Sequence, residues 1–511
     1  MLKRVRIILT VLLLLATVGV DAQVTTASMA GKVTDASNEP IIGATVQAVH
    51  QPSGSRYGTV TNVDGRYSIQ GMRTGGPYRV EISYIGYQTV IYKDITLQLG
   101  EVYNLNVEMS ESSELLNEVI VTAAKTKFTA EKTGATTNIS SAQMTQLPTV
   151  NRSISDIARL SPYANGMSFA GGDGRSTNFT IDGANFNNNF GLSSNLPGGG
   201  NPISMDAIEE VQVVVAPFDV RQTNFIGGGI NAITKSGTNT FRGTAYTYYR
   251  NQDMRGNRIN GEDLGARSDE SKTTYGFTLG GPIIKNKLFF FVNYEKEKTP
   301  GEVIKYRARE DGEDAKGMVS RTLKSDMEKV YNHLKDKYGY DAGSYTNFPA
   351  DEENTKLLAR IDWNITDRHR LSLRYNNTKN TAWNAPNGNS SDTGYRLNNT
   401  YRVGTQSMAF ANSMYSMDNK VQSWAADLNS RFTDKISNQL LFTYTNIEDM
   451  RGTNSSPFPF IDIMAGKDEN GNQILEPYMS AGYELFTYNN GVKNKLRTLP
   501  ITSPSSPVTT S

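Results

Sequence analysis

Alternation of apolar and polar residues is the strongest pattern in this chain, and it begins after residue 240. Leu357, Ala359, Ile361 and Trp363 take every second position, and polar or charged residues stand between most of them. The same period of two recurs at 288–295, 371–376, 424–429 and 440–444. Strands of about ten residues with one apolar and one polar face are typical of a barrel with lipid outside and water inside. Residues 241–498 are therefore predicted to form the first part of an antiparallel transmembrane β-barrel.

Short strands separated by turns precede this region, at residues 23–110. Examples are the segments 31–35, 40–46, 58–61, 64–69 and 78–84. Asp64-Gly65 is a dipeptide that favours a tight turn between two strands. Regular short strands joined by such turns predict a small β-sandwich.

The stretch from 111 to 240 mixes short helices with buried strands. Ser153 suits a helix N-cap, and the apolar spacing after it predicts a short helix over 154–160. Residues 205–215 have the pattern of a helical turn that leads into a buried strand. An α+β domain is expected at 129–240, behind a polar linker at 111–128.

The N-terminus has the layout of an export signal. Lys3, Arg4 and Arg6 precede a short apolar core, and small residues stand before Gln23. This order of basic end, apolar core and small-residue exit predicts a cleaved signal peptide at 1–22. An uncleaved anchor is the alternative, but the apolar core is short for one. Export also favours a barrel over a soluble sandwich for the alternating strands.

Composition excludes several classes of function. Lys+Arg 52 against Asp+Glu 51 gives a net charge of +1, which offers no basic patch for nucleic acid. The chain has no Cys, so disulfides and thiol nucleophiles are excluded. Its three His residues lack metallopeptidase spacing, and its glycine runs lack a phosphate-loop pattern. We therefore expect no enzymatic activity, no catalytic residue, no metal and no cofactor.

Residues 23–110 resemble the carboxypeptidase regulatory-like domain, a transthyretin-like sandwich. The resemblance rests on Gly31-x-Val33, Pro40-x-x-Gly43-Ala44-x-Val46, Thr61-x-x-x-Gly65-x-Tyr67 and Tyr84-Ile85-Gly86-Tyr87. Despite its name, this family implies no peptidase activity for the module. An accessory sandwich is therefore expected.

Residues 111–240 resemble the plug domain of TonB-dependent receptors. The matching segments are Ile181-Asp182-Gly183, Ile208-Glu209-x-Val211-x-Val213 and Gly228-Gly229-Ile230-Asn231-x-Ile233-Thr234-Lys235. The run Glu118, Val119, Ile120, Val121, Thr122, Ala123 resembles a TonB box, a segment that can add as a strand to a sheet edge. Two longer segments, 159–164 and 216–221, are most similar to the Oar-like subgroup of these receptors.

The resemblance implies energy-coupled import across a Gram-negative outer membrane. TonB with its inner-membrane energising complex, outer-membrane lipid and an imported, bulky substrate are the implied partners. Contact with TonB falls on the six residues 118–123. The residues expected to contact substrate are Gly171, Gly172, Asp173, Arg175, Asp182 and Asn185. Siderophore, oligosaccharide, peptide and protein cargo all stay open.

Two features depart from the family pattern. The region after residue 240 is too short for the ~22 strands of a plugged transporter. Residues 499–511 form an irregular tail rich in Pro, Ser and Thr, where an aromatic-ended final strand is expected. The hypothesis that follows is a truncated copy of a longer receptor.

Two other functions compete with import. A surface-binding or adhesive outer-membrane protein would use the sandwich and the plug without transport, and it would not need residues 118–123. A hydrolase is the second, and the absence of Cys and of paired His argues against it.

Overall fold

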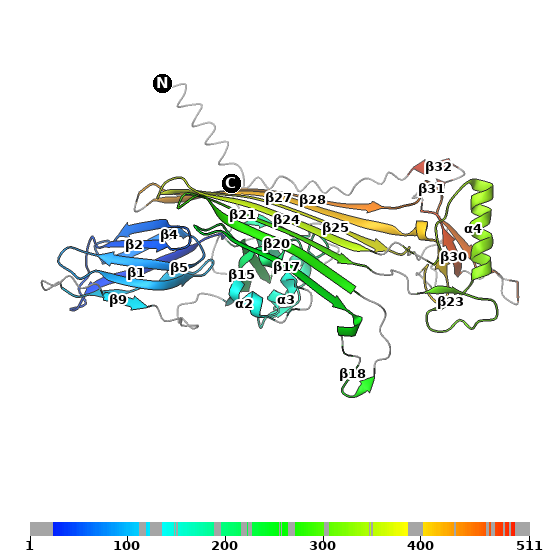
Figure 1. Ribbon diagram of the computed structural model, residues 1–511, viewed down its shortest axis with the longest axis horizontal. Coiled ribbons are helices and arrows are strands. Elements are labelled where there is room, and N and C mark those ends of the chain that lie inside the picture. The colour runs from blue at the N-terminus through cyan, green and yellow to red at the C-terminus, as the bar shows by residue number, and fades with distance from the viewer. Residues whose placement is uncertain are drawn as a thin grey trace, which may run out of the picture.

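The computed structural model describes residues 24–111, 119–122, 135–147, 149, 152–188, 196–215, 222, 227–254, 256, 258–263, 271–300, 306–346, 348, 351–386, 402–433, 436–466, 470–471, 476–483, 486–489 and 492–495. Figure 1 shows a β-sandwich at one end, a long twisted sheet with a small domain beneath it, and a cap carrying helix α4 at the other end. The predicted signal peptide and the C-terminal tail lie outside the described residues.

The N-terminal module is a two-layer β-sandwich. One sheet has the order β4-β1-β7, with β8 also paired to β1, and the other has the order β3-β2-β5-β6-β9. Apolar residues alternate toward a common core between the layers, among them Met29, Val46, Tyr78 and Ile82. The strands are β1 (Ala27–Asp35), β2 (Thr45–His50), β3 (Ser55–Val60), β4 (Arg66–Met72), β5 (Gly75–Ser83), β6 (Val90–Leu97), β7 (Val102–Asn104), β8 (Val107–Met109) and β9 (Val119–Thr122).

The plug is a small α+β domain built on a five-stranded sheet with the order β10-β15-β16-β13-β14. The predicted helix is confirmed as α3 (Ile154–Ala158), and Ser153 and Asp156 form its capping box. The predicted passage at 205–215 from a helical turn into a buried strand is confirmed as η2 followed by β15. The other elements are β10 (Ala135–Ser140), α2 (Ser141–Gln146), β11 (Ala164–Asn165), β12 (Ser168–Phe169), η1 (Gly174–Ser176), β13 (Asn178–Ile181), β14 (Ala184–Asn185), η2 (Met205–Ala207), β15 (Ile208–Val215) and β16 (Gly228–Thr234).

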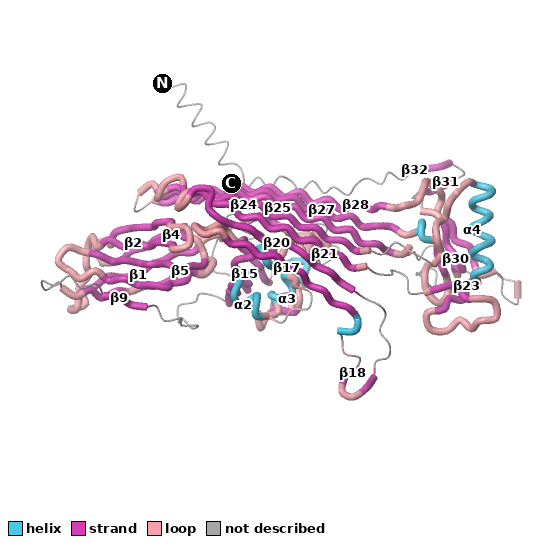
Figure 2. The backbone as a smooth tube through the Cα atoms, in the orientation of Figure 1, coloured by secondary structure: helices cyan, strands magenta, loops and turns pink. Residues whose placement is uncertain are grey.

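A seven-stranded antiparallel sheet with the order β17-β20-β21-β24-β25-β27-β28 forms the body of the molecule. Within the described residues β17 and β28 do not pair with each other, so the sheet is an open arc and not a closed barrel. The strands are β17 (Arg242–Asn251), β20 (Ser271–Ile284), β21 (Leu288–Thr299), β24 (Glu352–Asn364), β25 (His369–Asn384), β27 (Tyr415–Arg431) and β28 (Ser437–Gly452). Figure 2 shows these strands crossing the molecule side by side.

The two faces of this sheet follow the alternation in the sequence. On the outer face Trp363, Trp424 and Phe442 are 40%, 53% and 61% exposed. On the inner face, Lys356 and Asp362 are fully buried or nearly so. The predicted fold class is thus confirmed, with one difference. The strands reach 17 residues in β27, longer than the ten or so expected, because they run on toward the cap.

The two ends of the sheet differ in their connections. Turns at the sandwich end are short, whereas the connections at the opposite end are long, as expected for the periplasmic and extracellular sides of an outer-membrane sheet. The long connections fold into a cap with its own core, which includes Met327, Phe410 and Met479. Its elements are β22 (Arg307–Arg309), β23 (Val319–Leu323), α4 (Lys324–Tyr338), β26 (Met408–Ala409), η4 (Ala411–Ser413), β29 (Ile461–Met464) and β30 (Pro477–Ala481).

Four short strands and one 3-10 helix lie in the connections outside these modules. None of the helices in the described part of the chain has the length and apolar character that crossing a bilayer requires. The remaining elements are η3 (Gln252–Met254), β18 (Arg258–Ile259), β19 (Glu262–Asp263), β31 (Phe486–Asn489) and β32 (Val492–Lys495).

Candidate functional site

A two-residue hairpin turn positions the carboxylate of Asp182. Strands β13 and β14 pair with Ile181 opposite Ala184, and Asp182 and Gly183 form the turn with φ values of 45° and 80°. Both φ values are positive, as in the type I′ turns for which Asp-Gly is a preferred dipeptide. Asp182 Oδ1 accepts a hydrogen bond from the backbone N–H of Thr234 at 2.8 Å, and Oδ2 accepts one from Thr234 Oγ1 at 2.6 Å. The carboxylate is thereby held against the end of β16.

Two arginines of the long sheet face this carboxylate. Arg374 Nη1 on β25 donates to Asp182 Oδ2 at 3.1 Å, and it also donates to the carbonyl of Ile181. Arg360 Nη1 on β24 lies 3.6 Å from Asp182 Oδ1 and donates to the carbonyl of Thr234 at 2.8 Å. The Arg374 side chain is only 2% exposed. Because buried charges are costly without a partner, these contacts bind the plug to the sheet wall.

The same network continues into the N-terminal sandwich. Arg360 donates from Nε and Nη2 to the carboxylate of Asp362, at 2.9 and 3.0 Å. Arg73 of the sandwich lies 3.6 Å from Asp362 and donates to Ser236 Oγ at 3.2 Å. One chain of charges therefore joins the sandwich, the sheet and the plug.

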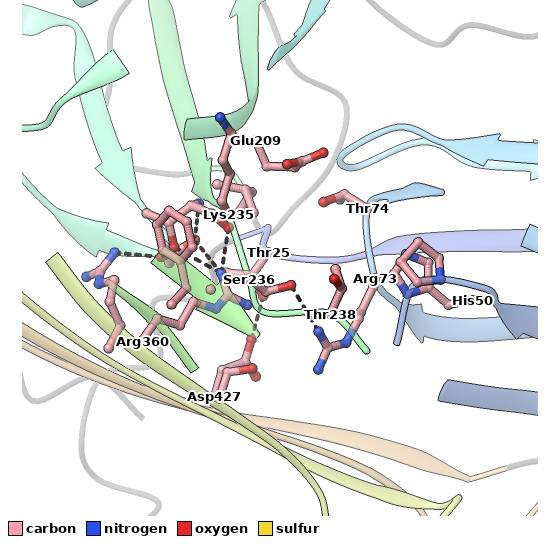
Figure 3. Close-up of a pocket in the computed structure, with 18 of the residues that line it drawn as sticks. Thr25, His50, Arg73, Thr74, Glu209, Lys235, Ser236, Thr238, Arg360 and Asp427 are labelled. Atoms are coloured by element: carbon pink, nitrogen blue, oxygen red, sulfur yellow. Dashed lines mark hydrogen bonds and ion pairs between the residues drawn. The ribbon is translucent and has the colours of Figure 1, made fainter. Parts of the chain in front are cut away.

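A cavity of about 430 Å³ lies where the three modules meet. Figure 3 shows Arg73 and His50 reaching it from the sandwich, Lys235 from the plug end, and Arg360 and Asp427 from the sheet. Burial, and secondarily the positive charge of Arg73, lowers the pKa of His50 to about 3. His50 is therefore a neutral ring at physiological pH, and its Nδ1 makes a 2.7 Å hydrogen bond with Ser53 Oγ.

The sandwich also contacts the plug directly, through the loop between its strands β6 and β7. Glu210 Oε1 on β15 accepts from the backbone N–H of Leu99 at 3.0 Å, and Gln212 Nε2 donates to the carbonyl of Leu99 at 2.6 Å. Burial is the largest influence on Glu210 and raises its pKa to about 8. These hydrogen bonds join the sandwich to strand β15 of the plug.

A second buried ion pair lies deeper along the inner face. Lys356 Nζ on β24 and Glu295 Oε1 on β21 are 2.8 Å apart, with side chains 2% and 5% exposed. Ser204 Oγ of the plug donates to Glu295 Oε2 at 2.7 Å, and Tyr246 donates to the same oxygen at 3.0 Å. The plug is therefore bound to the sheet at two separate buried places.

The residues expected to contact substrate fall into two environments. Gly171, Gly172, Asp173 and Arg175 lie in a loop beside η1, with Gly171, Asp173 and Arg175 exposed. Arg175 Nη2 and Asp173 Oδ2 are 2.5 Å apart, and the hydrogen bonds from Arg175 lower the pKa of Asp173 to about 2. Asp182 belongs instead to the buried network. Asn185 is half-buried on β14, where its Oδ1 accepts from the backbone of Asn187 at 2.7 Å.

The segment expected to contact TonB is partly described. Val119–Thr122 form strand β9, whereas Glu118 and Ala123 lie outside the described residues. β9 pairs in parallel with β6, with Val119 opposite Val90 and Thr122 opposite Lys93. The segment is thus an extended strand on the sandwich sheet.

Comparisons with known proteins agree with this architecture. Residues 28–110 match the family described as "Carboxypeptidase regulatory-like domain", and residues 233–303 match the family described as "Outer membrane beta barrel domain". The chain is 25% identical over 376 residues to the TonB-dependent transporter Oar of Myxococcus xanthus. The matched region covers 68% of this chain and 33% of that protein. The chain therefore carries a carboxypeptidase regulatory-like domain and a segment of an outer-membrane β-barrel, and it is similar to a TonB-dependent transporter.

Solved structures of outer-membrane receptors are also similar. The outer membrane transporter YddB from Escherichia coli is 16% identical, with a TM-score of 0.43, over 68% of this chain and 43% of that chain. The siderophore receptor PirA from Pseudomonas aeruginosa is 15% identical, with a TM-score of 0.39, over 63% of this chain and 42% of that chain. The chain thus spans about a third of the curated relative, and less than half of these two structures.

The sequence analysis did not single out the charged residues of the long sheet that lie at its contact with the plug. Arg360, Arg374 and Lys356 sit at polar positions of alternating strands, where a charge is ordinarily read as facing water. The one feature that could have indicated them is that they are long, charged side chains at the inward-facing positions of their strands. Arg73 carried no signal, because its partner Asp362 is far away in the sequence.

Proposed function

We propose that this chain works in TonB-dependent, energy-coupled uptake of a bulky substrate across the outer membrane. The apolar outer face of the sheet contacts lipid, and the signal peptide at 1–22 directs export. β9 is the segment that TonB binds. The receptor needs no catalytic group or cofactor for this role, because its work is to bind, occlude and release.

The observation that carries the proposal is the ion network around Asp182. The buried Asp182–Arg374 ion pair and the hydrogen bond from Ser204 to Glu295 hold the plug against the inner face of the sheet. Removing one partner of a buried ion pair costs about 3–5 kcal/mol, so these contacts contribute substantially to keeping the plug in place. An external pull on the chain that precedes the plug is a physically sufficient way to loosen these contacts.

The exposed loop with Asp173 and Arg175 is the proposed place of substrate contact. It offers glycines and an accessible charged pair, whereas Asp182 is committed to Arg374 and Thr234. The class of substrate is left to experiment. A pore also requires further strands at the open edges of β17 and β28, because unpaired backbone in lipid is costly.

Deleting Val119–Thr122 in the native bacterium tests the proposal. A strain lacking the gene is first grown on panels of iron chelates, oligosaccharides and peptides to find the nutrient it can no longer use. The 119–122 deletion should lose the same nutrient. Deleting Thr129–Lys132, an equally long piece of the following segment, is the matched control and should leave growth intact.

Surface binding without transport predicts a different result. In that case the 119–122 deletion behaves like the wild type in every assay that the whole-gene deletion affects. Equal growth of the two strains on the identified nutrient would therefore overturn the import proposal.

A further inference from the structure

Strand β9 stands at the edge of the sandwich sheet. The sheet has the order β3-β2-β5-β6-β9, and β9 pairs with β6 in parallel over four residues, from Val90↔Val119 to Lys93↔Thr122. Figure 1 shows β9 as the outermost strand on that side of the sandwich. β9 pairs along one of its two hydrogen-bonding edges, and along the other edge no strand of the described part of the chain pairs with it.

The sandwich places this strand in a defined position. Immediately before the linker, Gln88 N donates to the carbonyl of Ser110 at 2.9 Å, and Tyr87 forms a bridge with Glu111. Only seven residues separate Glu111 from the first residue of β9, so the bridge keeps the segment close to β6. A short tether of this kind gives a high effective concentration, so a four-residue strand can stay paired.

Pairing with β6 orders the segment before any partner arrives. Val90 and Ile91 of β6 are 5% and 1% exposed, so the strand that supports β9 is part of the sandwich core. Backbone groups of an extended segment alternate between its two edges, and the open edge carries unpaired N–H and C=O groups. An edge of this kind accepts another strand by main-chain hydrogen bonds.

We propose that the sandwich displays the coupling strand, and that a strand of TonB adds to the open edge of β9 while β9 stays paired with β6. This inference rests on the proposed function, because it assumes that TonB is the partner of residues 119–122. It assigns the regulatory-like sandwich a role in coupling. The sandwich pre-orders the strand, which removes part of the entropy cost of binding.

A disulfide between β6 and β9 tests the display. Lys93 and Thr122 are register partners and Lys93 is exposed, so K93C with T122C joins β9 to an exposed position of β6. Paired strands lie ~4.8 Å apart, within the span that a disulfide bridges. The wild-type chain has no Cys, so only the introduced pair can form a disulfide. Binding of the purified periplasmic domain of TonB to the full chain is measured before and after reduction, with K93C alone as the control for folding.

The display predicts that the oxidised variant binds TonB at least as tightly as the reduced one, to within about threefold. In the wild type, hydrogen exchange should slow in residues 119–122 on binding and stay unchanged in 90–97. If oxidation weakens binding by about tenfold or more and reduction restores it, β9 must leave β6 and the display is wrong. If neither the wild type nor the reduced variant binds, both this inference and the coupling role of 119–122 fail.

Discussion

Replacing Asp182 by Asn should loosen the plug. The substitution keeps the size of the side chain and removes the negative charge that faces Arg374 and Arg360. Arg360 keeps the carboxylate of Asp362, at 2.9 Å from its Nε, so it stays compensated. The Arg374 side chain is 2% exposed, and among the described residues its carboxylate partner is Asp182. The loss therefore falls mainly on one buried guanidinium.

The magnitude follows from that burial. Removing one partner of a buried ion pair costs about 3–5 kcal/mol. Because about 1.4 kcal/mol is a factor of ten, opening of the plug should become roughly a hundredfold to a few thousandfold more frequent. The free energy that changes is that of local opening of the plug, not of global unfolding.

Thiol labelling measures this opening on a clean background, since the chain has no Cys. Ala158 on α3 is 0% exposed, so A158C reacts with a maleimide only when the plug core opens. Labelling rates are compared for A158C with and without D182N, in the full chain in detergent. The matched control is D173N, which removes an exposed carboxylate from the same domain and should change the rate little, because solvent screens an exposed ion pair.

The reasoning fails if D182N raises the labelling rate by less than about tenfold, which corresponds to ~1.4 kcal/mol. It also fails if D173N raises the rate as much as D182N does. Either result would mean that packing, and not the buried charges, holds the plug in place.

Three further outcomes are expected. K356M should lower the unfolding free energy by about 3–5 kcal/mol in urea titrations, and adding E295Q should recover much of it, because Glu295 is then no longer a buried unpaired charge. The pKa of His50 is about 3 in the folded protein and 6.5 in the unfolded chain, so the folding stability that its neutral ring contributes is present above pH 6.5 and is lost as the pH falls toward 3, by up to about 1.4 kcal/mol per pH unit. H50Q should flatten this part of a plot of unfolding free energy against pH. An unchanged slope would contradict the lowered pKa of His50. G183A should lower plug stability by about 1 kcal/mol in the labelling assay, because its φ is 80°, whereas the neighbouring A184G should not show that strain.

Local patterns in the sequence determined the modules and most of their elements. Period-two alternation defined the strands of the long sheet and their two faces, because each residue adds one step to a fixed pleat. The cap at Ser153 and the Asp182-Gly183 turn depend on neighbouring residues only, so the sequence alone could predict them. The apolar outer face was equally readable, since Trp363 stands between Asp362 and Asn364.

Only the tertiary structure decided what those elements meet. The polar face of the sheet was expected to line a wet lumen, but Lys356 and Arg374 are buried against the plug. Asp182 was expected near substrate, but its partners lie on strands almost two hundred residues later, at Arg360 and Arg374. The pairing of β9 with β6 likewise depends on a main-chain edge, which any β-prone segment can occupy. Ion pairs and strand edges of this kind are set by three-dimensional proximity, and sequence spacing carries no record of it.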